Sequence, residues 1–161
     1  MLKREYDQVC SIARTLEVLG ERWTLLVIRD VFNGRRRFDQ IQENLGVARN
    51  VLSTRLAWLV DEGILEKRAY QERPPRYEYF LTDKGLDLWP VMISLLHWGD
   101  RYLSEDDGPP MLIRHKRCGG IVDDRGYCTE CGRRLTARDA YKEHGPGAPE
   151  EWREAEPAAA H

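Results

Sequence analysis

FDQIQENLGVARNVLSTRLAWLVDEGIL, residues 38–65, has the apolar spacing of two short helices joined by a tight turn. Gly46 stands where a helix exit needs a residue that tolerates positive φ, and a second helix is expected to begin near Arg49. One face of the second helix is apolar, formed by Leu52, Leu56, Leu59 and Val60. The opposite face carries Asn50, Thr54, Ala57 and Asp61, with Ser53 at its edge. The stretch predicts a helix-turn-helix whose polar face can enter the major groove of DNA, because short side chains there reach base edges.

Charge is unevenly distributed around this stretch. The whole chain holds 25 Lys and Arg against 27 Asp and Glu, a formal charge of −2, whereas nucleic-acid-binding proteins are usually basic. Residues 35–55, however, carry five arginines against one aspartate and one glutamate. The last sixteen residues carry four glutamates and one arginine. An acidic C-terminal segment therefore masks a basic patch beside the polar helix.

Two strands are predicted directly after the helix-turn-helix. Residues 64–70, ILEKRAY, and residues 76–81, RYEYFL, have the composition and alternation of a hairpin. Pro74 and Pro75 separate them, and Arg73 and Arg76 flank this tip. A basic hairpin behind a helix-turn-helix is a wing.

Further helices are predicted on both sides of this region. Residues 10–19 form one, and residues 23–32 form a second that is apolar around most of its circumference and should be buried. After the wing, Thr82 should cap a long helix that ends near Leu103 and bends at Pro90. Its apolar residues cover more than one side, which predicts a partner helix and a dimer. The alternative is a helix packed entirely within one monomer.

Three of the four cysteines and one histidine form two similar motifs. His115-Lys-Arg-Cys118-Gly and Cys128-Thr-Glu-Cys131-Gly each place two metal-binding side chains three residues apart, in front of a glycine. This spacing is typical of a zinc-ribbon-like site with one structural zinc ion per chain. Four protein ligands leave no position for an activated water. The alternatives are a metal-free cysteine cluster, or a site in which water or His144 replaces His115.

The same features restrict location and function class. No segment reaches the roughly 18 to 20 apolar residues of a membrane span, and the N-terminal residues have no signal-peptide core. We therefore expect a cytoplasmic protein that does not bind membranes and whose cysteines stay reduced. No catalytic nucleophile and base, and no phosphate-binding glycine loop, is recognisable, so we do not expect an enzyme.

The predicted fold class is mainly α (α+β), a winged helix-turn-helix with a long C-terminal dimerisation helix and a small zinc-ribbon-like module. The DNA-binding and dimerisation domain should span residues 1–105, followed by a linker at 106–110. The zinc-ribbon-like module should span 111–140, and the Pro, Ala and Glu-rich residues 141–161 should be a disordered tail.

Residues 10–103 resemble the HxlR family of bacterial winged helix-turn-helix regulators. The positions that carry the resemblance are Cys10, Gly20-x-x-Trp23-Thr24, Arg37-Phe38, Leu52-x-x-Arg55-Leu56, Pro74-Pro75 with Tyr79, Leu81-Thr82-x-x-Gly85 and Trp98-Gly99. The resemblance implies a homodimer that binds operator DNA, with Cys10 as a candidate sensor of oxidants or electrophiles. Arg14, one helical turn further on, could lower the pKa of such a thiol. The alternative for Cys10 is a buried core residue. Two positions depart from the family pattern: Ser11 replaces a frequent proline, and Ala48 replaces a frequent serine cap.

The candidate DNA-contacting residues fall into two groups. Arg49, Asn50, Ser53 and Thr54 occupy the first turns of the polar helix and are assigned to base edges or the groove. Phosphate contacts are assigned to Arg35, Arg36, Arg37, Arg55, Arg73 and Arg76. For Arg55, an ion pair with an acid of its own domain is the alternative.

We interpret the chain as a transcriptional regulator, with repression favoured, that binds palindromic operator DNA as a homodimer and responds to a small-molecule or oxidant effector. The competing interpretation is a winged-helix and zinc-ribbon module that binds a partner protein without sequence-specific DNA binding.

Overall fold

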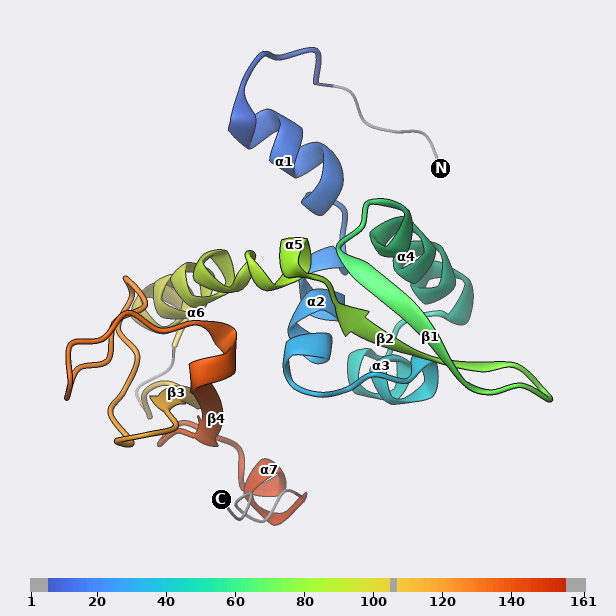
Figure 1. The fold of residues 1–161 in the computed structure, drawn as a ribbon. Coiled ribbons are helices and arrows are strands. Elements are labelled where there is room, and N and C mark those ends of the chain that lie inside the picture. Colours follow the sequence, from blue (N-terminus) through green and yellow to red (C-terminus); the bar gives the residue numbers. More distant parts are fainter. Residues whose placement is uncertain (1–5, 105–106, 156–161) are drawn as a thin grey trace. The chain divides into compact units, whose positions relative to one another are not determined.

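The computed structural model of the chain describes residues 6–104 and 107–155, and Figure 1 shows its helices and strands. Residues 1–5, 105–106 and 156–161 lie outside the described residues. These residues include the predicted boundary between the first domain and the linker. They also include the start of the predicted DNA-binding domain and the end of the predicted tail. The chain divides into two compact units between Asp87 and Leu88. The division therefore falls before the last long helix, whereas the sequence places it after that helix.

The first unit has the element order of a winged helix-turn-helix. Its elements are α1 (Ser11–Leu19), α2 (Thr24–Phe32), α3 (Phe38–Leu45), α4 (Arg49–Asp61), β1 (Leu65–Gln71), β2 (Arg76–Leu81) and α5 (Asp83–Leu86). The two strands pair antiparallel, with Leu65 opposite Leu81. Figure 1 shows them as a hairpin that projects beyond α3 and α4. The helix-turn-helix and wing predicted from the sequence are confirmed.

The predicted inner face of α4 is buried. Leu52 and Leu56 are 1% exposed and Leu59 is 0% exposed. The helix contacts both α2 and α3. Buried partners on those helices include Val27, Ile28 and Ile41. Burial of a leucine side chain stabilises a fold by about 1.5–3 kcal/mol, so this face orients α4.

The turn between α3 and α4 ends as the sequence predicts. Gly46 has a φ of 60°, and its N–H donates to the carbonyl of Gln42 at 2.9 Å. Val47 is buried next to it, 5% exposed. A left-handed residue thus reverses the chain between the two helices.

A buried carboxylate links α2 to α3. Asp30 is fully buried, and its carboxylate accepts hydrogen bonds from Arg29 Nη2 at 2.9 Å and from Asn44 Nδ2 at 2.8 Å. A buried charge is tolerated when it is paired and hydrogen-bonded in this way. The angle between the two helices is therefore held by a polar contact as well as by apolar packing.

The prediction of one long helix from Thr82 to Leu103 is wrong in one respect: the structure has two separate helices in this segment. Thr82 caps α5 by accepting a hydrogen bond from the N–H of Gly85 at 3.1 Å. The second helix, α6 (Trp89–Leu103), begins separately with Pro90 in its first turn. Proline lacks an N–H and suits the start of a helix better than its interior, so it marks a beginning here. Within the described ranges, no helix is long and apolar enough to cross a membrane.

The second unit combines α6 with the cysteine-bearing residues. Its other elements are β3 (Met111–His115), a 3-10 turn at Ala137–Asp139, β4 (Ala140–His144) and α7 (Glu150–Ala155). β3 and β4 pair antiparallel, with Met111 opposite His144 and His115 opposite Ala140. Residues 141–155, which the sequence assigns to a disordered tail, thus include an ordered strand and a helix. β3 and β4 pair although about thirty residues separate them, so no hairpin pattern in the local sequence indicates this pairing.

One side of α6 packs against the cysteine-bearing residues. Trp89 and Ile93 are 7% and 4% exposed, and His97 Nε2 lies 2.9 Å from the carbonyl oxygen of Val122. Arg101 pairs with Asp124 at 3.2 Å. The other side of α6 is exposed and apolar along Val91, Leu95, Trp98 and Tyr102.

Candidate DNA interface and metal centre

The first turns of α4 present the predicted polar face to solvent. Arg49, Asn50, Ser53 and Thr54 are all exposed. The guanidinium of Arg49 lies 4.7 Å from the ring centroid of Phe38 and 3.8 Å from the Asp39 carboxylate. The side chain of Arg49 therefore lies against the first turn of α3, the first helix of the helix-turn-helix.

The N-terminus of α4 carries no side-chain cap from Ala48, whose backbone is extended with φ of −60° and ψ of 139°. The first backbone N–H groups of an α-helix have no partner within the helix. They form a partial positive charge that favours anions. The absent serine cap thus leaves donors available beside Arg49.

Two of the three consecutive arginines before α3 lie against the wing. Arg36 lies over the ring of Phe80 and Arg37 over the ring of Tyr70, each 4.6 Å from the centroid. Arg37 also donates to Glu78 at 2.9 Å, and this hydrogen bond raises the pKa of its guanidinium. The arginines before α3 and the wing therefore form one basic surface.

The other predicted phosphate-binding arginines occupy different places. Arg73 and Arg76 are exposed at the wing tip, and Arg35 is partly buried. With Arg36 and Arg37 they extend the basic surface from the start of α3 to the end of the wing. We call these five residues the wing-side arginines.

Arg55 does not belong to this surface, because its side chain is buried in the first unit. It is 6% exposed, and its Nη2 lies 3.7 Å from the carboxylate of Glu21. Burial lowers the pKa of Arg55, and the charge of Glu21 opposes this shift. Of the two roles considered for Arg55, the structure has the ion pair within its own domain. Its assignment to the DNA-contacting residues is corrected accordingly.

Cys10 is exposed at the N-cap position of α1. The nearby backbone N–H groups of Ala13 and Ile12, at the start of the helix, lower the pKa of its thiol. The alternative of a buried core cysteine therefore does not apply. The helix start therefore supplies partial positive charge that favours the thiolate.

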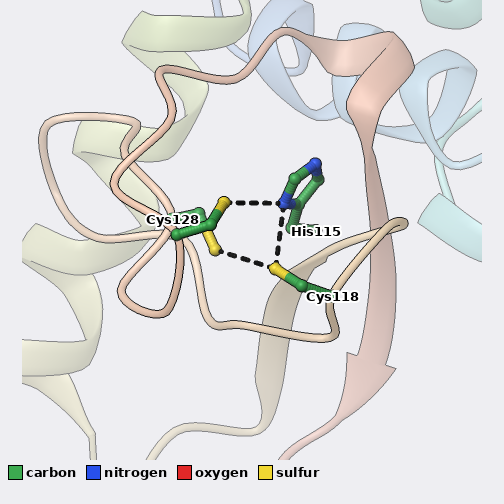
Figure 2. Close-up of side chains that lie close together, drawn as sticks. His115, Cys118 and Cys128 are labelled. Carbon is green, nitrogen blue, oxygen red and sulfur yellow. Dashed lines mark hydrogen bonds between the residues drawn. The ribbon is translucent and has the colours of Figure 1, made fainter.

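The four predicted metal ligands lie together at one end of the β3–β4 sheet. Their ligand atoms are all within 4.8 Å of one another, with His115 and Cys128 buried and Cys118 and Cys131 exposed. His115 Nδ1 lies 3.1 Å from Cys118 Sγ and 3.4 Å from Cys131 Sγ. Figure 2 shows the imidazole nitrogen of His115 directed at the thiol of Cys118, with Cys128 beside it. A tetrahedral zinc ion separates its sulfur and nitrogen ligand atoms by about 3.5–3.8 Å. The separations in the cluster, from 3.1 Å to at most 4.8 Å, lie on both sides of this range, so the four ligand atoms are close enough to hold such an ion.

Hydrogen bonding prepares Cys128 for metal binding. Burial opposes ionisation of this thiol, but the backbone N–H groups of Cys131 and Glu130, with Cys118 and His115, lower its pKa to about 6. The thiolate is the form of cysteine that binds metals. The turn after Cys128 therefore stabilises negative charge at the centre of the cluster.

Gly120 is a residue of this site that the sequence analysis did not single out. A Cβ atom there would lie 2.5 Å from Cys128 Sγ and 2.8 Å from the Cβ of Glu130. The chain can pass this close to the cluster only without a side chain. The Gly119-Gly120 pair directly after Cys118 is the signal that could have identified it.

Basic residues surround the cluster on the outside. Lys116 and Arg117 stand between the first two ligands, and Arg133 and Arg134 follow the last; all four are exposed. Three thiolates and a neutral imidazole give a divalent ion a net charge of −1, which these residues offset.

The family can now be identified from the sequence match. The HxlR-like helix-turn-helix family matches residues 18–107, more than half of the chain. The chain belongs to the HxlR family. It is a DNA-binding transcriptional regulator, a class that is typically not enzymatic.

Related proteins support the HxlR assignment beyond the helix-turn-helix. An HTH-type transcriptional regulator of Mycobacterium tuberculosis is 47% identical over 137 residues, which cover 85% of this chain and 87% of that protein. A match of this length in a chain of 161 residues must extend into the cysteine-bearing residues.

Two solved structures have the same fold. The crystal structure of the transcription factor PA1607 is 34% identical with a TM-score of 0.67, and the match covers 81% of this chain and 92% of that one. The reduced form of the transcriptional regulator YodB from Bacillus subtilis is 29% identical with a TM-score of 0.51. That match covers 60% of this HxlR-family chain and 97% of YodB.

Proposed function

We propose that this regulator binds palindromic operator DNA as a homodimer in the cytoplasm, with repression as its favoured action. The observation that carries the proposal is the exposed polar turn of α4 beside the five wing-side arginines. Arg49, Asn50, Ser53 and Thr54 read base edges in the major groove, because their donors match guanine and adenine. The wing-side arginines contact phosphates.

A phosphate also suits the uncapped start of α4. The free N–H groups of Arg49, Asn50 and Val51 favour an anion, and a DNA phosphate supplies one on complex formation. Hydrogen exchange at these amides should therefore slow in the presence of operator DNA. Equal exchange with and without operator would remove this contact from the proposal.

Two exposed apolar surfaces support a homodimer. On α6, Val91, Leu95, Trp98 and Tyr102 follow helical spacing and are 44%, 46%, 56% and 62% exposed. Near α1, Val9, Ile12 and Leu16 are 94%, 71% and 46% exposed. Aligned apolar residues of this kind are typical of a helix–helix interface. A symmetric dimer would place its two α4 helices on half-sites about 34–36 Å apart, one turn of DNA.

The His/Cys cluster holds one structural zinc ion per chain in this proposal. Three sulfur donors and one nitrogen donor within 4.8 Å of one another favour zinc over harder cations. When bound, the ion supplies folding free energy and no open coordination position. Metal analysis of protein purified without chelator tests this, and less than about half an equivalent of zinc would contradict it.

Cys10 is the proposed sensor of electrophiles or oxidants. With a Michael acceptor, its thiolate would form a bond to the β-carbon, and the α-carbon would take up a proton. Exposure and the lowered pKa of the Cys10 thiol support this role. If Cys10→Ser retained electrophile-responsive release from DNA, sensing would lie elsewhere.

The central experiment is selection of bound fragments from the host's own genomic DNA, followed by titration of the selected operator at several salt concentrations. About four phosphate contacts per subunit predict a log–log salt slope near −7. Preference for a palindrome and this steep slope support regulation through operator binding. No binding at low salt would instead support the protein-interaction module.

A further inference from the structure

The metal ligands are connected to α6 by a short path within the second unit. Cys128 forms a β-bridge with Val122, a residue that is fully buried. The N–H of Asp123 donates to the carbonyl of Tyr127 at 2.8 Å, which closes the hairpin between these ligand turns. The carbonyl oxygen of Val122 lies 2.9 Å from Nε2 of His97 in α6. One hairpin thus contacts the cluster on one side and α6 on the other.

A second and a third contact join the same hairpin to α6. Arg101 pairs with Asp124 at 3.2 Å. The ring of Trp89 lies beside Gly126, where an added Cβ would be in ordinary van der Waals contact with the ring at 3.6 Å. Trp89 itself is 7% exposed. The hairpin therefore contacts α6 near its start, its middle and its end.

The hairpin has little apolar packing of its own. Among the described residues 111–144, the buried apolar side chains are Val122, Cys128 and Leu135. A module with so small a core depends on bound metal for its folding free energy. Loss of the ion would therefore loosen the hairpin and uncover the side of α6 that holds Trp89 and Ile93.

The His/Cys cluster is also accessible to competing metal ligands from solution. Cys118 and Cys131 are exposed, whereas Cys128 and His115 are buried toward the hairpin. A competing thiol or chelator can reach the exposed pair, and the buried pair would transmit the loss. A structural zinc ion held here would therefore be more accessible to competing ligands than a fully enclosed one.

We propose that the His/Cys cluster is an effector site, and that its occupancy by a soft divalent metal ion such as zinc controls α6. Metal-loaded protein keeps α6 covered on one side and ready to dimerise through the other. Metal loss loosens α6, weakens the dimer and lowers operator affinity. The link from α6 to operator binding rests on the proposed homodimer.

The test uses the full chain loaded with zinc or stripped by EDTA, with metal content measured in each sample. Hydrogen exchange of the α6 amides, residues 92–103, is read by mass spectrometry, and the dimer dissociation constant is measured by sedimentation. We expect faster exchange in α6 and an increase of about tenfold or more in the dimer dissociation constant after stripping, both reversed by zinc, in the usual range for coupled sites. Unchanged exchange and unchanged dimerisation after verified metal loss would overturn the proposal.

His97→Leu tests the path itself, because it removes the group that contacts Val122 without touching a metal ligand. We expect normal zinc content but a smaller effect of metal removal on α6 exchange than in the wild type. Ser94→Ala is the matched control, since Ser94 is exposed and its hydroxyl donates to the carbonyl of Pro90 in its own helix at 3.0 Å. It should retain the full effect. An equal metal effect in all three proteins would contradict this path.

The two proposals can fail separately. If the zinc-loaded protein is monomeric or does not bind the selected operator, the proposed function fails, whatever α6 does. If the loaded protein dimerises and binds operator but neither property nor α6 exchange responds to zinc, the effector proposal fails alone.

Discussion

The wing tip offers the sharpest test of the proposed DNA interface. Arg73 and Arg76 are exposed there, so replacing both by alanine removes positive charge without opening a buried site. Each phosphate contact contributes about 0.9 to the log–log salt slope. Two contacts in each of two subunits therefore correspond to a slope that is shallower by about 3.6, roughly half of the value near −7 expected for the wild type.

The assay is fluorescence anisotropy of a labelled operator, titrated at several salt concentrations. Preference for the operator over a scrambled duplex should be retained, because the base-facing residues of α4 are unchanged. Arg55→Met is the matched control: it also removes one arginine, but a buried one paired with Glu21. It should leave the slope unchanged and lower the stability of the fold. A wild-type slope in the wing-tip variant, or a shallower slope in Arg55→Met, would refute the assignment.

The remaining predictions concern stability, metal affinity and thiol reactivity. Leu56→Ala should lower the free energy of unfolding by about 2–5 kcal/mol, because Leu56 is 1% exposed; urea denaturation measures this, and a loss below about 1 kcal/mol would contradict its core role. Gly120→Ala should weaken zinc binding by about tenfold or more in a chelator competition, because the added Cβ would meet Cys128 Sγ at 2.5 Å; unchanged affinity would show that the turn adapts. The alkylation rate of Cys10 by iodoacetamide should rise with pH and level off at a lower pH than that of free cysteine, since its pKa is lowered and the thiolate persists to lower pH; an inflection at or above that of free cysteine would count against it.

Local patterns predicted the elements that local physics determines. The spacing of Leu52, Leu56 and Leu59 identified the buried face of α4, and Gly46 identified the turn before it, because helix periodicity and positive φ are short-range properties. The two ligand pairs of the metal site were found for the same reason, since each pair lies within one turn. The wing followed from alternation on either side of a proline tip.

Features that depend on distant partners were predicted incompletely: the sequence allowed an ion pair for Arg55 only as an alternative, and it did not identify the partner. Arg55 lies on the buried side of α4, three residues after Leu52, but its partner Glu21 comes from a different part of the chain. The pairing of β3 with β4 likewise needs both strands to be known. The break before α6 had a local signal in Pro90, which was interpreted as a bend because the apolar residues continue on both sides of it.

The arginines stacked on the wing affect the entropy of binding. A free arginine side chain has about 2 kcal/mol of rotamer entropy, much of which is lost when it is fixed on a ligand. Arg36 and Arg37 lie over aromatic rings in the protein without DNA, so part of that loss is already incurred when the chain folds. The free protein thus holds these two guanidinium groups in place before it meets a phosphate, and the complex requires less further ordering.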